Sequence, residues 1–285
     1  MKLITVEQME AATERLLENG RQVGADSWQQ RVKNQTPHCK FGEEGVCCRI
    51  CSMGPCRVTP KAPRGICGCD VHGIVARNYL RFTAGGAATH SDHGRSICHT
   101  LYQTKEGGNY TVKDPEKLKR IAGEWGIATE GKDIYDLAHE VAETALMEYG
   151  KPFGLQRFLS RAPEHTQKLW HDAGIEPRAI DREVSQSLHM THMGCSSLPE
   201  ALIRQSLRAG LCDGWGGSMC GTEFSDVLFG TPKPVDTTAN LGVMEKDMVN
   251  IVVHGHDPSL SEMIVFYAQD PEMIALAKEQ GAKGI

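Results

Sequence analysis

The stretch that decides the fold is Cys39-Lys-Phe-Gly-Glu-Glu-Gly-Val-Cys47-Cys48-Arg-Ile-Cys51-Ser-Met-Gly-Pro-Cys56, followed by Cys67-Gly-Cys69. It holds seven of the chain's eleven cysteines. Thiolates at this density, with Gly and Pro between them, favour a soft metal centre, and iron–sulfur is the centre that fits best. The segment therefore predicts a protein that handles electrons.

The adjacent pair Cys47-Cys48 divides the cysteines into two groups. Neighbouring side chains diverge by about 100° on a helix and about 180° on a strand, so one small cluster does not use both. Cys48, Cys51, Cys56 and Cys67 supply the four thiolates of a 4Fe-4S cluster within one subunit.

Cys47 is then left for a second centre, with Cys39 as its nearest companion. Two thiolates do not complete a four-cysteine site, but a two-fold axis brings the same two from a second copy. This spacing predicts an iron–sulfur cluster shared across a homodimer; whether it is 2Fe-2S or 4Fe-4S stays open.

Structural zinc and disulfide bonds are the two alternative uses of these cysteines. Structural zinc favours two CxxC knuckles, and only Cys48-x-x-Cys51 has that form. Disulfides suit exported proteins, whereas this sequence shows no signal peptide and has an odd number of cysteines. Both uses rank below an iron–sulfur centre.

Composition limits the function classes. The chain has 285 residues, 40% hydrophobic content and a formal net charge of −5, which allows a sizeable core and argues against nucleic-acid binding. No apolar run reaches the roughly 20 residues of a membrane span. We expect a cytoplasmic protein without a membrane segment.

Helical patterns dominate most of the sequence. Thr5 and Gln8 form a capping box that opens a helix to Leu17. An apolar stripe from Asp133 to Tyr149 predicts another, and Pro199 opens one to about residue 210. Further helices are expected over 115–125, 165–173 and 178–190. Residues 1–240 are thus predicted to form a mainly α, cluster-binding domain.

The pattern changes in residues 241–285, which we expect to begin a Rossmann-like α/β domain. Residues 248–253 predict a buried strand, and two helices follow over 259–268 and from the N-cap Asp270 to Lys278. The last residues, 281–285, resemble the entry to a second strand. Because a parallel sheet needs further strands, we expect a fragment of a longer polypeptide.

The motif Cys-x7-Cys-Cys-Arg-x-Cys-x-x-Gly-Pro-Cys-Arg, from Cys39 to Arg57, resembles the start of the anaerobic nickel–iron–sulfur carbon monoxide dehydrogenases. The resemblance covers nearly the whole chain. It continues through Gly65-Ile-Cys67-Gly, Ile74-Val-Ala-Arg-Asn78, His90-Ser-Asp-His93-Gly-Arg95, Asp213-Gly-Trp-Gly-Gly-Ser218, Phe229-Gly-Thr-Pro232, Asn240-Leu-Gly-Val243 and Val249-Asn-Ile-Val-Val-His-Gly-His-Asp-Pro258.

The resemblance implies the same division of the six cysteines, and adds a nickel–iron–sulfur active-site cluster with one histidine ligand in His254-Gly-His256. His256 is preferred, because Gly255-His256-Asp257 matches a Gly-His-Asp pattern of the related hybrid-cluster proteins. The remaining ligands of that cluster, and a lysine that assists the chemistry, lie beyond Ile285 in the family. We therefore expect this chain alone to hold the two electron-transfer clusters and to be incomplete for catalysis.

Three histidines, His90, His93 and His99, stand at intervals of three and six residues, a stripe that resembles the family's proton path. Imidazoles take up and release protons near neutral pH, and Ser96 occupies the missing step. A solvated helix face is the plain alternative. Asp213 resembles the family's active-site carboxylate, although its glycine-rich surroundings alone predict a turn.

The function implied is the reversible oxidation of carbon monoxide with water to carbon dioxide, two protons and two electrons. The electrons would leave to a ferredoxin-like acceptor, with acetyl-CoA synthase or a hydrogenase as a further partner. The alternatives are a non-catalytic electron-transfer module and a hybrid-cluster hydroxylamine reductase. The other cysteines are expected to be small buried hydrophobes: Cys69, Cys98, Cys195, Cys212 and Cys220.

Overall fold

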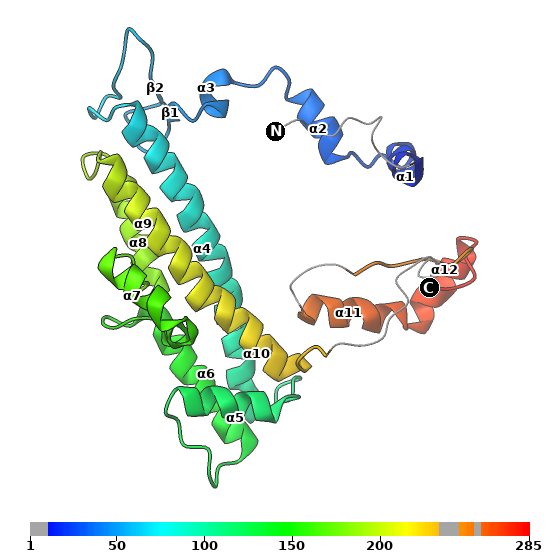
Figure 1. Ribbon diagram of the computed structural model, residues 1–285. Coiled ribbons are helices and arrows are strands. Elements are labelled where there is room, and N and C mark those ends of the chain that lie inside the picture. Colours follow the sequence, from blue (N-terminus) through cyan, green and yellow to red (C-terminus); the bar gives the residue numbers. More distant parts are fainter. Residues whose placement is uncertain (1–10, 234–244, 254–257) are drawn as a thin grey trace. The chain divides into compact units, whose positions relative to one another are not determined.

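The computed structural model describes residues 11–233, 245–253 and 258–285, and most of them are helical (Figure 1). They form two compact units: residues up to Asn78 with Thr191–Pro199, and Tyr79–Met190 with Glu200–Ile285. No helix among the described residues is long and apolar enough to cross a membrane. The helices are α1 (Ala11–Gln22), α2 (Trp28–Asn34), α3 (Lys40–Glu43), α4 (Val71–Gln103), η2 (Thr104–Glu106), α5 (Pro115–Glu124), α6 (Ile134–Gly150), η3 (Arg157–Arg161), α7 (Glu164–Asp172), α8 (Ile180–Thr191), α9 (Pro199–Cys212), η4 (Asp213–Ser218), α10 (Met219–Phe229), α11 (Pro258–Ala268) and α12 (Pro271–Glu279).

Seven of the predicted helices are confirmed: α5 to α9, α11 and α12. Their starts follow capping chemistry, because Asp133 accepts the backbone N–H of Tyr135 and Asp270 accepts those of Glu272 and Met273. The capping box at Thr5 lies outside the described residues. The boundary predicted at residues 240/241 falls in a stretch that the structure does not describe, and it stays a prediction.

The first unit carries the cysteine-rich segment on very little regular structure. Its strands β1 (Cys47–Cys48) and β2 (Cys56–Arg57) pair antiparallel. Its apolar core consists of buried Cys48, Cys69 and Ile74, with a few half-buried neighbours. Because so little apolar surface is buried there, a bound metal centre would supply much of the cohesion of this unit.

In the second unit, α4 lies alongside α9, η4 and α10 (Figure 1). A Cβ added at Gly217 in η4 would lie 2.7 Å from the carbonyl carbon of His90, and one at Gly221 in α10 would lie 3.0 Å from the His93 ring. The two helical runs therefore approach closely because glycines line the contact. η4 is a π-helical turn, a feature that frequently occurs at functional sites.

The apolar core of the second unit lies between α4, α5, α6, η3 and α10. Trp125, Phe158 and Phe224 form its aromatic centre, with ring centroids 4.8 to 6.2 Å apart. Phe224 is fully buried. This packing holds α10, and with it the glycine contact, in place.

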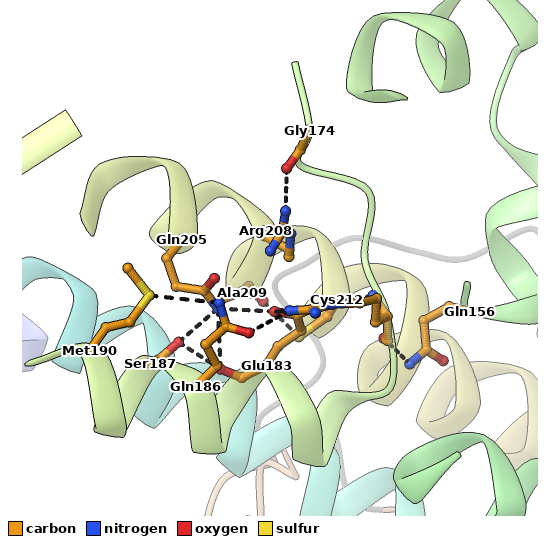
Figure 2. Close-up of polar contacts among 11 residues, drawn as sticks. Gln156, Gly174, Glu183, Gln186, Ser187, Met190, Gln205, Arg208, Ala209 and Cys212 are labelled. Atoms are coloured by element: carbon orange, nitrogen blue, oxygen red, sulfur yellow. Dashed lines mark hydrogen bonds and ion pairs between the residues drawn. The ribbon is translucent and has the colours of Figure 1, made fainter. Parts of the chain in front are cut away.

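A buried polar network joins α8 to α9 (Figure 2). Glu183 is fully buried; its carboxylate accepts from Arg178 Nε at 2.6 Å, Arg178 Nη2 at 3.0 Å and Gln205 Nε2 at 2.9 Å. Ser187 Oγ donates to the Glu183 carbonyl at 2.7 Å. Because each carboxylate oxygen has a partner, the network fixes α9, whose end carries Asp213.

The strand predicted over 248–253 is wrong for the described residues, which are irregular there. Its apolar side chains are not buried, and Val252 is 73% exposed. Two backbone bonds link this region to the end of the chain: Val249 N to Gly284 O at 2.9 Å and Lys283 N to Asp247 O at 2.6 Å. A single segment without further strands beside it cannot form a ladder.

Candidate metal centre

The cysteine-rich loop surrounds one pocket in the first unit. Four cysteines predicted as ligands, Cys48, Cys51, Cys56 and Cys67, line it together with Cys69. The rest of the wall is formed by Ile50, Gly54, Gly65, Ile66, Ile74, Arg77 and Met193. The structure thus brings together, around one small volume, thiols that span 20 residues of sequence.

Strand pairing sets the directions of the adjacent cysteines. Cys48 lies opposite Cys56, and Cys47 opposite Arg57. Successive strand residues point to opposite faces, and Cys48 lines the pocket whereas Cys47 does not. Asn78 of α4 fixes this strand, because its Nδ2 donates to the carbonyls of Gly45 and Cys47 at 3.0 Å.

Five thiols line the pocket, and cysteine thiolates are the usual ligands of iron–sulfur clusters, so the donor set fits a centre of this class. A glycine allows the close approach within this loop: a Cβ at Gly54 would lie 3.1 Å from the Cys56 nitrogen and 3.2 Å from the Cys48 carbonyl oxygen.

The surroundings in the pocket shift the pKa values of Cys67 and Cys69 in opposite directions. The backbone N–H of Cys69 lowers the pKa of Cys67; burial opposes this, and the guanidinium of Arg77 reinforces it. Cys69 is buried, and burial raises its pKa. The thiolate is the form that binds metal, and these two directions agree with the expectation that Cys67 is a ligand and Cys69 a buried thiol.

The remaining cysteines have different surroundings. Cys39 is exposed at the start of α3, and Cys47 is half-buried. The expectation of a buried hydrophobe is confirmed for Cys69, Cys98, Cys212 and Cys220 and is wrong for Cys195, which is exposed. Cys195 lies in the loop of residues 191–199, whose side chains around it face solvent. The sequence around a single cysteine does not predict this exposure.

The second group of predicted residues lies in the other unit, where α4 meets η4. His90 Nδ1 lies 2.6 Å from Asp213 Oδ1, with side chains 50% and 26% exposed. When the carboxylate accepts the Nδ1 proton, Nε2 is left with a free lone pair. A positioned imidazole of this kind can take up a proton from a bound molecule.

All three predicted histidines lie on α4, where His93 is half-buried and His90 and His99 are exposed. Each three-residue step turns by about 60° short of a full turn, so His90 and His99 lie about 180° apart around the axis. The row therefore spirals around the helix instead of following one face. His254 and His256 lie outside the described residues.

Sequence reasoning missed two pocket residues, Arg77 and Met193. Arg77 belongs to the quoted Ile74–Asn78 motif, but its burial is visible only once α4 is in place. Met193 reaches the pocket from a segment more than a hundred residues away in sequence, and no local pattern predicts such a contact.

Comparison with known proteins agrees with this geometry. The profile of the Prismane/CO dehydrogenase family matches residues 46–285. The chain belongs to this family. Carbon monoxide dehydrogenase 1 of Methanosarcina mazei is 48% identical over 282 residues, which are 97% of this chain and 45% of that protein. The carbon monoxide dehydrogenase/acetyl-CoA synthase subunit beta of Moorella thermoacetica is 41% identical, over 90% of this chain and 39% of the relative.

A solved structure from the same family is similar over the whole length of the chain. The nickel-free carbon monoxide dehydrogenase of Thermococcus sp. AM4 has a TM-score of 0.87 and 45% identity, covering 100% of this chain and 46% of that one. The mainly helical fold is therefore confirmed. The chain spans about 45% of the length of the carbon monoxide dehydrogenases 1 of Methanosarcina mazei, Methanosarcina acetivorans and Carboxydothermus hydrogenoformans.

Proposed function

We propose that this chain acts in the reversible oxidation of carbon monoxide with water to carbon dioxide, two protons and two electrons. The observation that carries the proposal is the pocket lined by Cys48, Cys51, Cys56 and Cys67, in a member of the Prismane/CO dehydrogenase family. These four thiols would hold a 4Fe-4S cluster that passes the electrons on.

A second cluster would use Cys39 and Cys47 together with the same two residues of another copy in a homodimer. The exposure of Cys39 and the turn of Cys47 away from the pocket support this assignment. An isologous interface presents each patch to itself, so two thiols per chain suffice.

The reaction itself would take place at a nickel–iron–sulfur cluster, which supplies a metal that binds carbon monoxide and activates water. His256 is its proposed ligand in this chain. His90 would accept a proton through Nε2, while Asp213 holds Nδ1 and thereby the ring orientation. His93, one step further along α4, is proposed to receive the proton next, and His99 is proposed to take part in proton release at the opposite side of the helix.

A ferredoxin-like protein is the proposed electron acceptor, and acetyl-CoA synthase or a hydrogenase a further partner. A relative from Moorella thermoacetica bears the name of a joint carbon monoxide dehydrogenase/acetyl-CoA synthase subunit. Residues 241–285 would begin a Rossmann-like α/β domain. The backbone bonds between 247–249 and 283–284 bring together the two segments on either side of α11 and α12.

The test is reduction of a viologen dye under carbon monoxide by a complete enzyme that contains this chain, purified without oxygen and supplied with iron, sulfide and nickel. Asp213→Asn should lower the rate by about 10²-fold or more, since an oriented general base contributes about 10² to 10⁴. Asp92→Asn, an exposed change on the same helix α4, is the matched control and should leave the rate unchanged.

Other outcomes would point elsewhere. If the purified protein contains iron and sulfide but no nickel, and does not reduce the dye, the chain is an electron-transfer module. Reduction of hydroxylamine in place of carbon monoxide oxidation would favour a hybrid-cluster relative. Either result would overturn the proposed catalytic function.

A further inference from the structure

Arg77 is a buried cation with unusual partners. It lies in α4 with only 3% of its surface exposed, and its Nε donates to the Ser196 carbonyl at 2.7 Å. Nη2 donates to the same carbonyl, and Nη1 lies 3.6 Å from Cys67 Sγ. No carboxylate in the described part of the chain forms an ion pair with it.

A second buried cation, Lys117, is paired differently. Lys117, 8% exposed, has the carboxylates of Glu223 and Asp226 beside it. Burying a charge without a counter-ion costs several kcal/mol, and a guanidinium cannot lose its proton to avoid this cost. Arg77 therefore needs negative charge in the pocket that it lines, and Cys67 is the group that can provide it.

We infer that Arg77 is the counter-charge of the metal centre in this pocket and sets its reduction potential. The inference rests on the proposed 4Fe-4S cluster. A cluster held by four thiolates is anionic and gains a further negative charge on reduction, so a nearby cation stabilises the reduced state more. The hydrogen bond to the Cys67 sulfur acts in the same direction.

The burial of Arg77 strengthens its electrostatic effect on the cluster, and its bond to the Ser196 carbonyl links the loop of residues 191–199 to the same side chain. Salt screens exposed charges within about 10 Å, but screens buried ones much less. Through Ser196, Arg77 also joins residues 191–199, which supply Met193 to the pocket wall, to the cysteine segment. Arg77 thus supplies positive charge to the pocket and also fixes the loop that forms part of the pocket wall.

The experiment is a redox titration, followed by electron paramagnetic resonance, of the full chain reconstituted with iron and sulfide without oxygen. Arg77→Gln removes the charge and keeps a hydrogen-bond donor, whereas Arg77→Lys keeps the charge. Arg64→Gln is the matched control: Arg64 lies in the same cysteine-rich segment but is exposed, and its Nη1 donates to the Gly68 carbonyl. Iron is counted in every variant.

Arg77→Gln should retain its iron and shift the midpoint to a more negative potential. We expect at least about a tenfold lower ratio of reduced to oxidised cluster at a fixed potential, which for one electron is about 59 mV. Arg77→Lys and Arg64→Gln should remain close to the unmodified chain. Loss of the cluster in Arg77→Gln, with a normal cluster in Arg77→Lys, would also support the inference.

An unchanged midpoint in iron-loaded Arg77→Gln would overturn it, as would an equal shift in Arg64→Gln. Loss of the cluster in Arg77→Lys would also overturn it, because the charge would then not be the decisive property. Absence of any iron–sulfur cluster in the unmodified chain would overturn the proposed function, and this inference with it, and is distinguished by the iron count.

Discussion

Replacement of Gly217 by alanine tests whether the glycine contact between α4 and η4 holds the histidine–aspartate pair together. The new Cβ would lie 2.7 Å from the carbonyl carbon of His90 and 2.8 Å from its oxygen. Both atoms belong to the backbone, so no side-chain rotation relieves the clash. The two helical runs must separate by about 0.7 Å to reach ordinary contact at 3.4 Å.

Overpacking of this kind costs about 1 to 3 kcal/mol of unfolding free energy, and alanine in a helix returns about 0.5 to 1. We expect a net loss of about 1 to 2 kcal/mol in urea denaturation. The shift also acts directly on His90, whose ring lies 2.6 Å from Asp213. The rate of dye reduction under carbon monoxide, measured on protein that contains its metals, should therefore fall together with the free energy of unfolding.

Gly214→Ala is the matched control in the same π-helical turn, because an added Cβ there meets nothing within 4 Å. It should leave stability unchanged or raise it by up to about 1 kcal/mol. Equal stabilities of the two variants, or a larger loss in Gly214→Ala, would refute the close-contact argument.

Three further predictions concern the second unit. Arg178→Met should lower the free energy of unfolding by about 3 to 5 kcal/mol in urea denaturation, because it leaves the fully buried Glu183 charge without its ion-pair partner. Glu183→Gln keeps a hydrogen-bonding group and should cost less, so equal losses in the two variants would contradict this reasoning. Phe224→Ala should cost about 3 to 5 kcal/mol by the same assay, and a loss below about 1 would show that the aromatic core collapses around the gap. Asp213→Asn should decrease the share of His90 carrying its proton on Nδ1, measured by nitrogen NMR of labelled histidine, and an unchanged tautomer would contradict the orienting role.

Helices with a continuous apolar stripe and a clear cap could be predicted from the sequence. Asp133, Asp270 and Pro199 each mark the start of a helix that the structure contains. Here capping and hydrophobic periodicity agree, and tertiary packing does not overrule them.

The 33-residue helix α4 was not predicted as a whole, because its buried face is mixed. Ile74, Leu80, Ile97 and Leu101 are buried on it, but Arg77, Ser91 and Gly94 are buried between them and interrupt the hydrophobic stripe. The glycines around Gly217 likewise indicated a turn, whereas their lack of side chains allows the π-helical turn to pack against α4. Close helix packing is a tertiary effect, so local propensity does not reveal it.

The candidate metal centre was the part most accessible from sequence, because ligand spacing is a local property. The different directions of Cys47 and Cys48 follow from strand alternation alone. The contribution of Arg77 was not accessible, since it depends on a helix and on the carbonyl of Ser196, 119 residues apart in the chain.

The most direct test of the metal centre is the iron and acid-labile sulfide content of the chain purified without oxygen, compared between Cys48→Ala and Cys69→Ala. Cys69→Ala should retain the iron and sulfide of the unmodified chain, and Cys48→Ala should contain roughly four irons and four sulfides fewer per chain, because it loses the cluster in this pocket. Zinc without sulfide in the unmodified chain, or equal retention of iron in the two variants, would contradict the account.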